Sequence, residues 1–276
     1  MGLRWLVTGC SSGVGRALAR RLADEGEQVL ATARRTQTLD DLAGRDNVEI
    51  AELDVRDETQ CAAAVNLAAQ RFGGIDVLVN NAGYGQFGAV EEVSGEQLRA
   101  QFETNVFGPW RLLKMVMPHW RAQGGGRALF VSSIAGFMPF PGMAAYTASK
   151  FALEGMAESL AQETAHLGIR VTILQLGSFA TKYGRSTVLP AAPVGVYEQV
   201  YGDMMAGLDD YENMPGLNHP AVFADMALRV ARLENPPLRV PVGPDAERFL
   251  TTALEQRAKE FTAVVDARLD APADYF

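Results

Sequence analysis

Short aliphatic runs alternate with helical patterns along most of this 276-residue chain. Such alternation is typical of βαβ units, in which parallel strands pack beneath helices. It predicts an α/β fold, a doubly wound parallel sheet of the Rossmann type. The strand candidates are Leu3–Thr8, Gln28–Ala33, Val48–Val55, Ile75–Asn80, Ala128–Ser132, Ile169–Leu176 and Leu238–Val242.

The chain carries no internal repeat, low-complexity tract or linker, and its length is ordinary for one large α/β unit. We therefore predict a single domain over residues 1–276. Two segments interrupt the pattern. The Gly108-Pro109 pair should kink or break a helix over 96–123. Residues 182–220 lose helical periodicity and are interrupted by Pro190, Pro193 and Pro215, which favours a substrate-binding lid over an idle loop.

The charge balance excludes several partners. Lys and Arg number 25 against 33 Asp and Glu, and the net charge of −8 disfavours nucleic acids and anionic membranes. Two cysteines and no secretory pattern lead us to expect a reduced, cytoplasmic protein without a disulfide. The three histidines are isolated from one another and from the cysteines, so no metal site is expected.

A glycine-rich turn, Thr8–Gly15 (TGCSSGVG), follows the first strand and opens the first helix. Glycines allow a pyrophosphate to approach the backbone N–H groups at the helix start, where the helix dipole also favours an anion. The spacing is G-x-x-x-G-x-G, which differs from the commoner dinucleotide pattern. A purely structural turn is the alternative. The expected cofactor contacts here are Gly9, Ser11, Ser12, Gly13, Val14 and Gly15.

Tyr146 and Lys150 lie four residues apart in a predicted helix over 145–167 and so share one face. A nearby ammonium favours phenolate, so we expect Lys150 to lower the pKa of Tyr146 toward the range useful for proton transfer. Taken alone, the pair could equally be part of a solvated helix face.

Taken together, these motifs resemble the short-chain dehydrogenase/reductase superfamily, in its single-domain branch, from Leu3 to about Gly243. The resemblance rests on the glycine turn, the order and spacing of the motifs, and the elements Asp54-Val55, Asn80–Gly83, Asn105, Ser133, Tyr146 and Lys150. The residues after Lys150, Phe151–Gly155, are most similar to steroid and retinol dehydrogenase-like members. Such relatives are often homodimers or homotetramers, and we expect the same here.

The resemblance implies a role for each matching residue. Tyr146 would be the proton donor or acceptor, Ser133 would hydrogen-bond the reacting oxygen, and Lys150 would bind the nicotinamide ribose. Asn105 would hold a water that links Lys150 to solvent. Cofactor contacts would also come from Asp54, Val55, Asn81, Ala82, Gly83, Gly177, Phe179 and Thr181. Asn80 is expected only to tie neighbouring strands together.

The end of the second strand predicts the cofactor. An NAD-preferring site usually has an acidic residue about 20 positions past the glycine turn, at the position of Ala33 here. Arg34 and Arg35 follow, and a guanidinium suits the 2′-phosphate of NADP(H). We predict NADP(H), with Arg34 as the main contact; a solvated arginine pair is the alternative, and NAD is the less favoured cofactor.

The expected substrate is a bulky, largely apolar ketone or secondary alcohol, steroid-like, retinoid-like or aryl. Its pocket would be lined by Phe137, Met138, Phe140, Tyr183, Val188, Leu189, Tyr197, Tyr201, Met204 and Met205. One departure stands out, because Leu176 replaces the proline usual before Gly177. A cofactor-sensing regulatory protein without catalysis is the other function considered, although a pure sensor would not need a positioned phenol.

Overall fold

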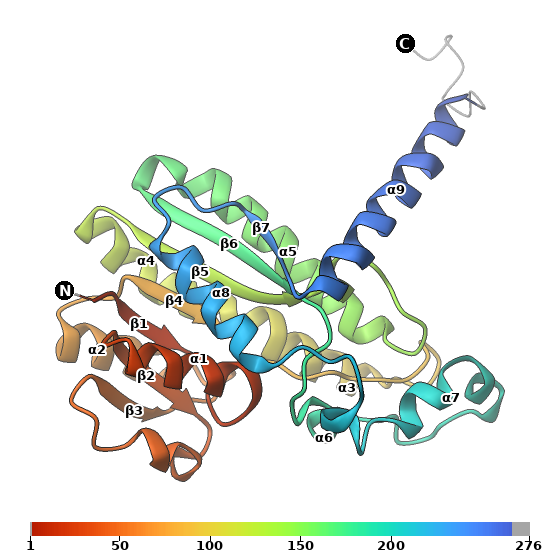
Figure 1. Cartoon of the computed structure of the whole chain (residues 1–276), viewed down its shortest axis with the longest axis horizontal. Coiled ribbons are helices and arrows are strands. Elements are labelled where there is room, and N and C mark those ends of the chain that lie inside the picture. The colour runs from red at the N-terminus through yellow and green to blue at the C-terminus, as the bar shows by residue number, and fades with distance from the viewer. Residues whose placement is uncertain (1, 267–276) are drawn as a thin grey trace.

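The seven predicted strands form one parallel sheet in the computed structural model, which describes residues 2–266 (Figure 1). The ends of the predicted domain, residues 1 and 267–276, lie outside this range. The order across the sheet is β3-β2-β1-β4-β5-β6-β7, so the prediction of a doubly wound sheet is confirmed. The strands are β1 (Arg4–Val7), β2 (Gln28–Ala33), β3 (Val48–Glu52), β4 (Val77–Asn80), β5 (Gly126–Ser133), β6 (Ile169–Leu176) and β7 (Arg239–Val242).

Helices cover both faces of the sheet (Figure 1). One buried cluster joins the sheet to α1 (Gly13–Asp24) and α8 (Pro220–Arg232) through side chains such as Leu18 and Phe223. The other joins it to α2 (Glu58–Phe72), α4 (Gly108–Gln123) and α5 (Ala144–Thr164). Each fully buried large apolar side chain contributes about 1.5–3 kcal/mol, which explains the apolar stripes read from the sequence.

The strand order reverses direction between β1 and β4. In open α/β sheets, ligands bind at the carboxyl ends of the strands beside such a switch point. The glycine turn follows β1, and Asn81–Gly83 follow β4, so both motifs lie at this point. The fold therefore brings the predicted cofactor motifs together.

The predicted helix over 96–123 is interrupted, as expected, just before Gly108-Pro109. It consists of α3 (Gly95–Phe102), a π-helical turn (Glu103–Phe107) and α4. A proline has no backbone N–H to donate, so it disturbs the helical hydrogen bonds of the preceding turn. Turns of π-helix are frequent at functional sites. Asn105 lies within this turn.

Residues 182–220, called the lid segment below, form short helices joined by loops beyond the sheet (Figure 1). They include α6 (Tyr183–Ser186) and α7 (Glu198–Ala206). Isolated β-bridges tie the two ends of the segment to the body, one between Gln86 and Val188 and one between Phe179 and Asn218. The lid segment thus has defined attachments.

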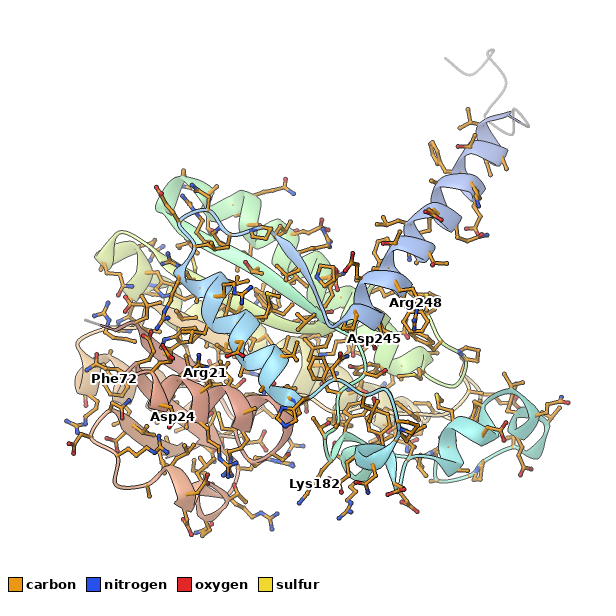
Figure 2. The ribbon with its side chains drawn as sticks, in the orientation of Figure 1. Arg21, Asp24, Phe72, Lys182, Asp245 and Arg248 are labelled. Carbon is orange, nitrogen blue, oxygen red and sulfur yellow. The ribbon has the colours of Figure 1, made fainter. Side chains whose placement is uncertain are left out.

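Helix α9 (Pro244–Asp266) begins against the body and then extends away from it (Figure 1). Its first turns bury Ala246 and Leu250 against Ile134, whereas Phe261 is 73% exposed. At its base, Asp245 accepts hydrogen bonds from the Ser178 N–H at 2.6 Å and from Asn218 Nδ2 at 2.6 Å (Figure 2). None of the helices within residues 2–266 is both long and apolar enough to cross a bilayer.

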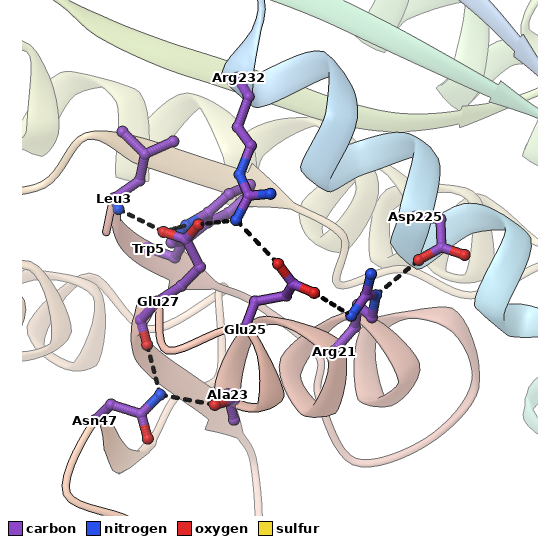
Figure 3. Close-up of polar contacts among 9 residues, drawn as sticks. All are labelled: Leu3, Trp5, Arg21, Ala23, Glu25, Glu27, Asn47, Asp225 and Arg232. Carbon is purple, nitrogen blue, oxygen red and sulfur yellow. Dashed lines mark hydrogen bonds and ion pairs between the residues drawn. The ribbon is translucent and has the colours of Figure 1, made fainter. Parts of the chain in front are cut away.

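At the amino ends of the strands, opposite the cofactor motifs, charged side chains join α1 to α8 (Figure 3). Arg232 pairs with the buried Glu27 at 2.7 Å and with Glu25 at 3.2 Å. Arg21 pairs with both Glu25 and Asp225. The paired charges satisfy the buried Glu27 carboxylate, so this network stabilises the fold at the end remote from the cofactor motifs.

Candidate active site

The glycine turn after β1 is packed so tightly that side chains would not fit. Gly9 and Gly13 adopt φ of 71° and 58°, in the left-handed region. A Cβ on Gly9 would lie 2.9 Å from the Ala82 Cα, and one on Gly15 would lie 2.6 Å from the Gly9 oxygen. The turn leads into the N-terminus of α1, where Ser12 makes no capping hydrogen bond. A dinucleotide pyrophosphate fits a helix start built in this way.

The segment after β4 is clamped to this turn. Thr8 Oγ1 accepts hydrogen bonds of 2.9 Å from the N–H groups of Asn81 and Ala82. Asn81 Nδ2 in turn donates to the main-chain oxygen of Thr8 at 2.7 Å. Asn81 and Ala82, both predicted as cofactor contacts, therefore lie beside the glycine turn. Asn80 pairs with Phe130 of β5 through the backbone, but its buried side-chain amide makes no hydrogen bond within residues 2–266 and adds no link between the strands.

The predicted adenosine side lies at the ends of β2 and β3. Arg34 and Arg35 are exposed immediately after β2, where Ala33 pairs with Glu52 of β3. The Asp54 carboxylate pairs with Arg56 at 2.6 Å, and this hydrogen bond is the main cause that lowers the pKa of Asp54. Arg34 lowers it further by its charge. Val55, also predicted as a contact, is buried beside Gly108.

Ser133, Tyr146 and Lys150 meet at the carboxyl end of β5. Ser133 ends that strand, and Tyr146 and Lys150 are buried on α5, which packs against it. Lys150 Nζ donates to the Val131 oxygen at 2.8 Å and lies 5.6 Å from the centre of the Tyr146 ring. The geometry thus joins the three residues that the motif spacing predicted.

The electrostatics differ from the prediction. Burial raises the pKa of Tyr146, although interaction with the Tyr183 and Ser133 hydroxyls opposes the increase. Burial also lowers the pKa of Lys150 to about 8. The expectation that Lys150 lowers the pKa of Tyr146 is therefore wrong for this structure, because desolvation of the phenol outweighs the effect of an ammonium that is hydrogen-bonded elsewhere.

Asn105 is held between the loop after β4 and α5. Its Nδ2 donates to the Tyr84 oxygen and to Ser149 Oγ, both at 3.1 Å, and its Oδ1 accepts from the Tyr84 N–H at 3.3 Å. Ser149 Oγ donates to the main-chain oxygen of Tyr146 at 2.7 Å. A Cβ on Gly83 would lie 3.1 Å from Asn105 Oδ1. Asn105 therefore supports the helix that carries Tyr146.

The loop after β6 reaches back to the glycine turn. A Cβ on Gly13 would lie 3.4 Å from the Thr181 side chain, so Thr181, predicted as a cofactor contact, lies against the glycine turn. Leu176, in place of the usual proline, pairs with Ser133 and with Val242, and the Gly177 N–H continues this pairing to the Val242 oxygen at 3.1 Å. Phe179 is buried. The substitution leaves the strand end ordered.

An aromatic cluster centred on Tyr183 adjoins Tyr146. The Tyr183 ring lies 6.1 Å from that of Tyr146, 6.2 Å from that of Tyr211 and 6.4 Å from that of Phe87, measured between centroids. The sequence pointed to Tyr183 but missed Phe87 and Tyr211. The sequence signals nearest to them were the Asn81–Gly83 motif, which Phe87 follows closely, and the lid segment, which contains Tyr211.

Two other predicted pocket residues, Phe137 and Phe140, lie against α9. Phe140 packs edge-on against Phe249 of α9, with centroids 6.5 Å apart, and the Arg257 guanidinium covers the Phe137 ring at 4.1 Å. Both rings are partly buried and pack against the cluster that the first turns of α9 form with Ile134. Met138 lies between them in the same loop.

The lid segment is attached to the loop after β4 by two carboxylates. Glu92, which is buried, accepts hydrogen bonds from the Tyr201 hydroxyl and from the Val194 N–H at 2.7 Å. Glu91 accepts from the Tyr197 hydroxyl at 2.6 Å. Both predicted pocket tyrosines thus use their hydroxyls to hold the lid segment.

Comparison with known proteins agrees with this geometry. The family model described as short chain dehydrogenase matches residues 4–189. An oxidoreductase of Botryotinia fuckeliana is 35% identical over 91% of this chain and 92% of its own length. Human 17-beta-hydroxysteroid dehydrogenase type 1 is 33% identical over 89% of this chain and 78% of its own length.

Solved structures match as well. A short-chain dehydrogenase from Streptomyces avermitilis superposes with a TM-score of 0.89 at 38% identity, over 97% of both chains. A Burkholderia cenocepacia short chain dehydrogenase in complex with NADP has a TM-score of 0.75 at 27% identity, over 98% of both chains. A Brucella melitensis 3-ketoacyl-(acyl-carrier-protein) reductase complexed with NADH has 0.76 at 26%, over 90% of this chain and 98% of that one.

The neighbours thus include complexes with either nicotinamide cofactor. The sheet order, the glycine turn and the placing of Ser133, Tyr146 and Lys150 at the end of β5 all fit the match to the family model, which covers well over half of the chain. This chain belongs to the short-chain dehydrogenase family of oxidoreductases, whose members act on CH–OH groups of small molecules with a nicotinamide cofactor.

Proposed function

We propose that this protein transfers a hydride between NADP(H) and a bulky, largely apolar ketone or secondary alcohol. The observation that carries this proposal is that the half-buried Ser133 lies with the buried Tyr146 and Lys150, and that the lid segment packs the Tyr183 ring beside Tyr146. A nicotinamide cofactor would supply or accept the hydride when bound. The chain's own residues would bind and orient both partners and move the proton.

Tyr146 acts as the acid in the reduction direction. Its raised pKa keeps the hydroxyl protonated at neutral pH, so the phenol donates its proton to the oxygen of the ketone as that oxygen becomes negative. Ser133 donates a second hydrogen bond to the same oxygen. Lys150 contributes a nearby positive charge, and Asn105 supports α5 through Ser149. In the oxidation direction the proton moves the opposite way.

The cofactor cradle would be formed by the glycine turn, by Asn81–Gly83 and by the Gly177–Thr181 loop. Preference for NADP(H) rests on Arg34 at the end of β2, where Ala33 replaces the acidic residue that favours NAD. A guanidinium forms charge-assisted hydrogen bonds with a phosphate. Ser11 and Ser12, both exposed in the turn, would assist.

The substrate side would be closed by the lid segment. Tyr183 packs beside Tyr146 and is itself flanked by Phe87 and Tyr211, and the half-buried Met204 and Met205 follow on α7. Methionine adapts to varied apolar shapes. The relative that acts on hydroxysteroids, by its name, supports the bulky apolar class. Acidic residues of the lid segment would repel anionic substrates.

We further propose a homodimer or homotetramer built on the long helices α4 and α5, in the cytoplasm. Exposed aromatic side chains support such a contact, since Trp110 on α4 is 55% exposed and Phe151 on α5 is 37% exposed. Light scattering after size-exclusion chromatography measures the assembly; a monomer at micromolar concentration would contradict it.

The experiment that tests the function is a panel of ketones and alcohols followed by nicotinamide absorbance. It includes steroid, retinoid and aryl ketones, sugars and carboxylated metabolites, each with NADPH and with NADH. We expect the highest kcat/KM for an apolar ketone with NADPH. A sugar or an anionic metabolite as the best substrate, or an equal or better kcat/KM with NADH, would overturn the corresponding part of the proposal.

A further inference from the structure

The hydroxyl of Tyr183 is buried and has no hydrogen-bond partner within residues 2–266. Tyr183 is the first residue of α6, and its ring lies between those of Tyr146, Tyr211 and Phe87. A buried donor that is left unsatisfied costs about 1–3 kcal/mol. Such a group beside the acid of the reaction calls for a partner that arrives with the ligand.

The position of this phenol is set by its surroundings. Gly85 leaves the space that the Tyr183 hydroxyl occupies, since a Cβ there would collide with that oxygen. The backbone around Tyr183 is held as well, because its N–H donates to Thr181 Oγ1 at 3.3 Å and its oxygen accepts from Ser186 Oγ at 2.8 Å. The space at Gly85 and these backbone hydrogen bonds therefore hold the Tyr183 ring beside Tyr146.

Counting acceptors indicates what the partner is. A ketone oxygen offers two lone pairs, and in the proposed reaction these are taken by the hydroxyls of Tyr146 and Ser133. The Tyr183 proton is then left over in the same site. The rings of Phe87 and Tyr211 offer it no strong acceptor, and although it interacts with the Tyr146 hydroxyl, no hydrogen bond of ordinary length and angle joins the two hydroxyls. A second oxygen on the substrate, close to the reacting carbonyl, would satisfy it.

We propose that Tyr183 is a specificity-determining residue, which donates a hydrogen bond to a second oxygen of the substrate next to the reacting carbon. This inference rests on the proposed ketone reduction. It narrows the substrate class to apolar ketones that carry an adjacent oxygen, such as α-hydroxy ketones, or to the corresponding diols. Burial and the neighbouring Tyr146 raise the pKa of Tyr183 well above its ordinary value, so the phenol remains a donor at neutral pH.

The test compares Tyr183→Phe with the unaltered enzyme on two ketones of nearly equal shape, α-hydroxyacetophenone and propiophenone. They differ by a hydroxyl in place of a methyl group. We expect the substitution to lower kcat/KM for α-hydroxyacetophenone by about tenfold, the size of one lost hydrogen bond, and to change it by less than about twofold for propiophenone. Thr252→Val, which removes an exposed hydroxyl of α9 already bonded to the main-chain oxygen of Arg248, should change neither kcat/KM.

Two results would overturn the inference. Equal losses for both ketones, with a displaced pH profile, would mean that Tyr183 acts through Tyr146. No loss for either would mean that its hydroxyl binds no substrate oxygen. Circular dichroism verifies that both variants fold.

Binding without turnover separates this inference from the proposed function. Calorimetry on Tyr146→Phe protein saturated with NADPH measures the affinity for each ketone, with and without the Tyr183→Phe change. A preference for α-hydroxyacetophenone that disappears with the Tyr183 hydroxyl supports the inference even if no reduction occurs, in which case only the proposed function fails. Equal affinity for the two ketones when Tyr183 is intact overturns the inference.

Discussion

Lys150 places its ammonium 5.6 Å from the centre of the Tyr146 ring while donating a 2.8 Å hydrogen bond to the main-chain oxygen of Val131. The lysine is thus fixed by the strand that ends in Ser133, and the phenol lies within reach of its charge. Because α5 carries both residues, one helix sets the distance between acid and cation. The relationship explains why a spacing of four residues is enough to form this pair.

Removing the phenolic hydroxyl should abolish turnover. Tyr146→Phe keeps the ring and its packing but removes the transferable proton, so kcat should fall by roughly 10²- to 10⁴-fold. Cofactor affinity, measured by fluorescence titration with NADPH, should stay nearly unchanged. Retention of most activity in the purified variant would contradict the mechanism, and Tyr197→Phe serves as the control for loss of a lid phenol.

Reversing the charge at the end of β2 should change the cofactor. Arg34→Glu removes the guanidinium proposed for the 2′-phosphate and introduces a carboxylate suited to a ribose hydroxyl. We expect kcat/KM with NADPH to fall by about 10- to 100-fold relative to NADH, as for loss of a charged hydrogen bond. The matched variant Arg35→Glu should have a smaller effect. If the two variants behave alike, Arg34 is not the main contact.

Shortening the two methionines of α7 should alter the choice of substrate. Met204→Ala with Met205→Ala removes apolar contact area from the lid segment, so kcat/KM for a polycyclic ketone should fall by about tenfold or more. A small ketone, which does not reach the lid segment, should be affected little. Met214→Ala changes an exposed methionine of the same segment and is the control. An unchanged ratio between the two ketones would remove these methionines from the pocket.

Glu92 should make the stability of the lid segment depend on pH. The Tyr201 hydroxyl, followed by the Val194 N–H, lowers the pKa of the Glu92 carboxyl below its ordinary 4.5. A carboxylate with a depressed pKa stabilises the folded state above the unfolded pKa, and this contribution is lost as the pH falls through the folded pKa. Glu92→Gln should therefore lower Tm by roughly 2–4 °C at pH ~7, and the difference should narrow below pH ~4.5.

The measurement is thermal unfolding followed by circular dichroism across that pH range. Glu91→Gln is the matched control, because Glu91 accepts from Tyr197 with its side chain exposed at the surface. A pH-independent difference for Glu92→Gln, or one equal to that of Glu91→Gln, would contradict the role assigned to this carboxylate.

The sequence by itself determined the features that depend on local pattern. Apolar periodicity predicted the seven strands, Gly108-Pro109 predicted the break beside Asn105, and the glycine turn with the 13-residue separation of Ser133 and Tyr146 predicted the family and the residues that meet at β5. These features follow from local backbone preferences and from spacing along the chain. Each helix leads into the next parallel strand, so the motifs that follow the strands lie at the same end of the sheet.

Only the tertiary structure decided what surrounds Tyr146. Tyr183 packs beside it and is itself flanked by Tyr211 and Phe87, from segments far apart in the sequence, whereas Phe137 and Phe140 pack against α9. The pKa of Tyr146 likewise depends on burial by those segments, which outweighs the lysine that the spacing had suggested. Burial and side-chain orientation are set by contacts between distant elements, and a local pattern carries no record of them.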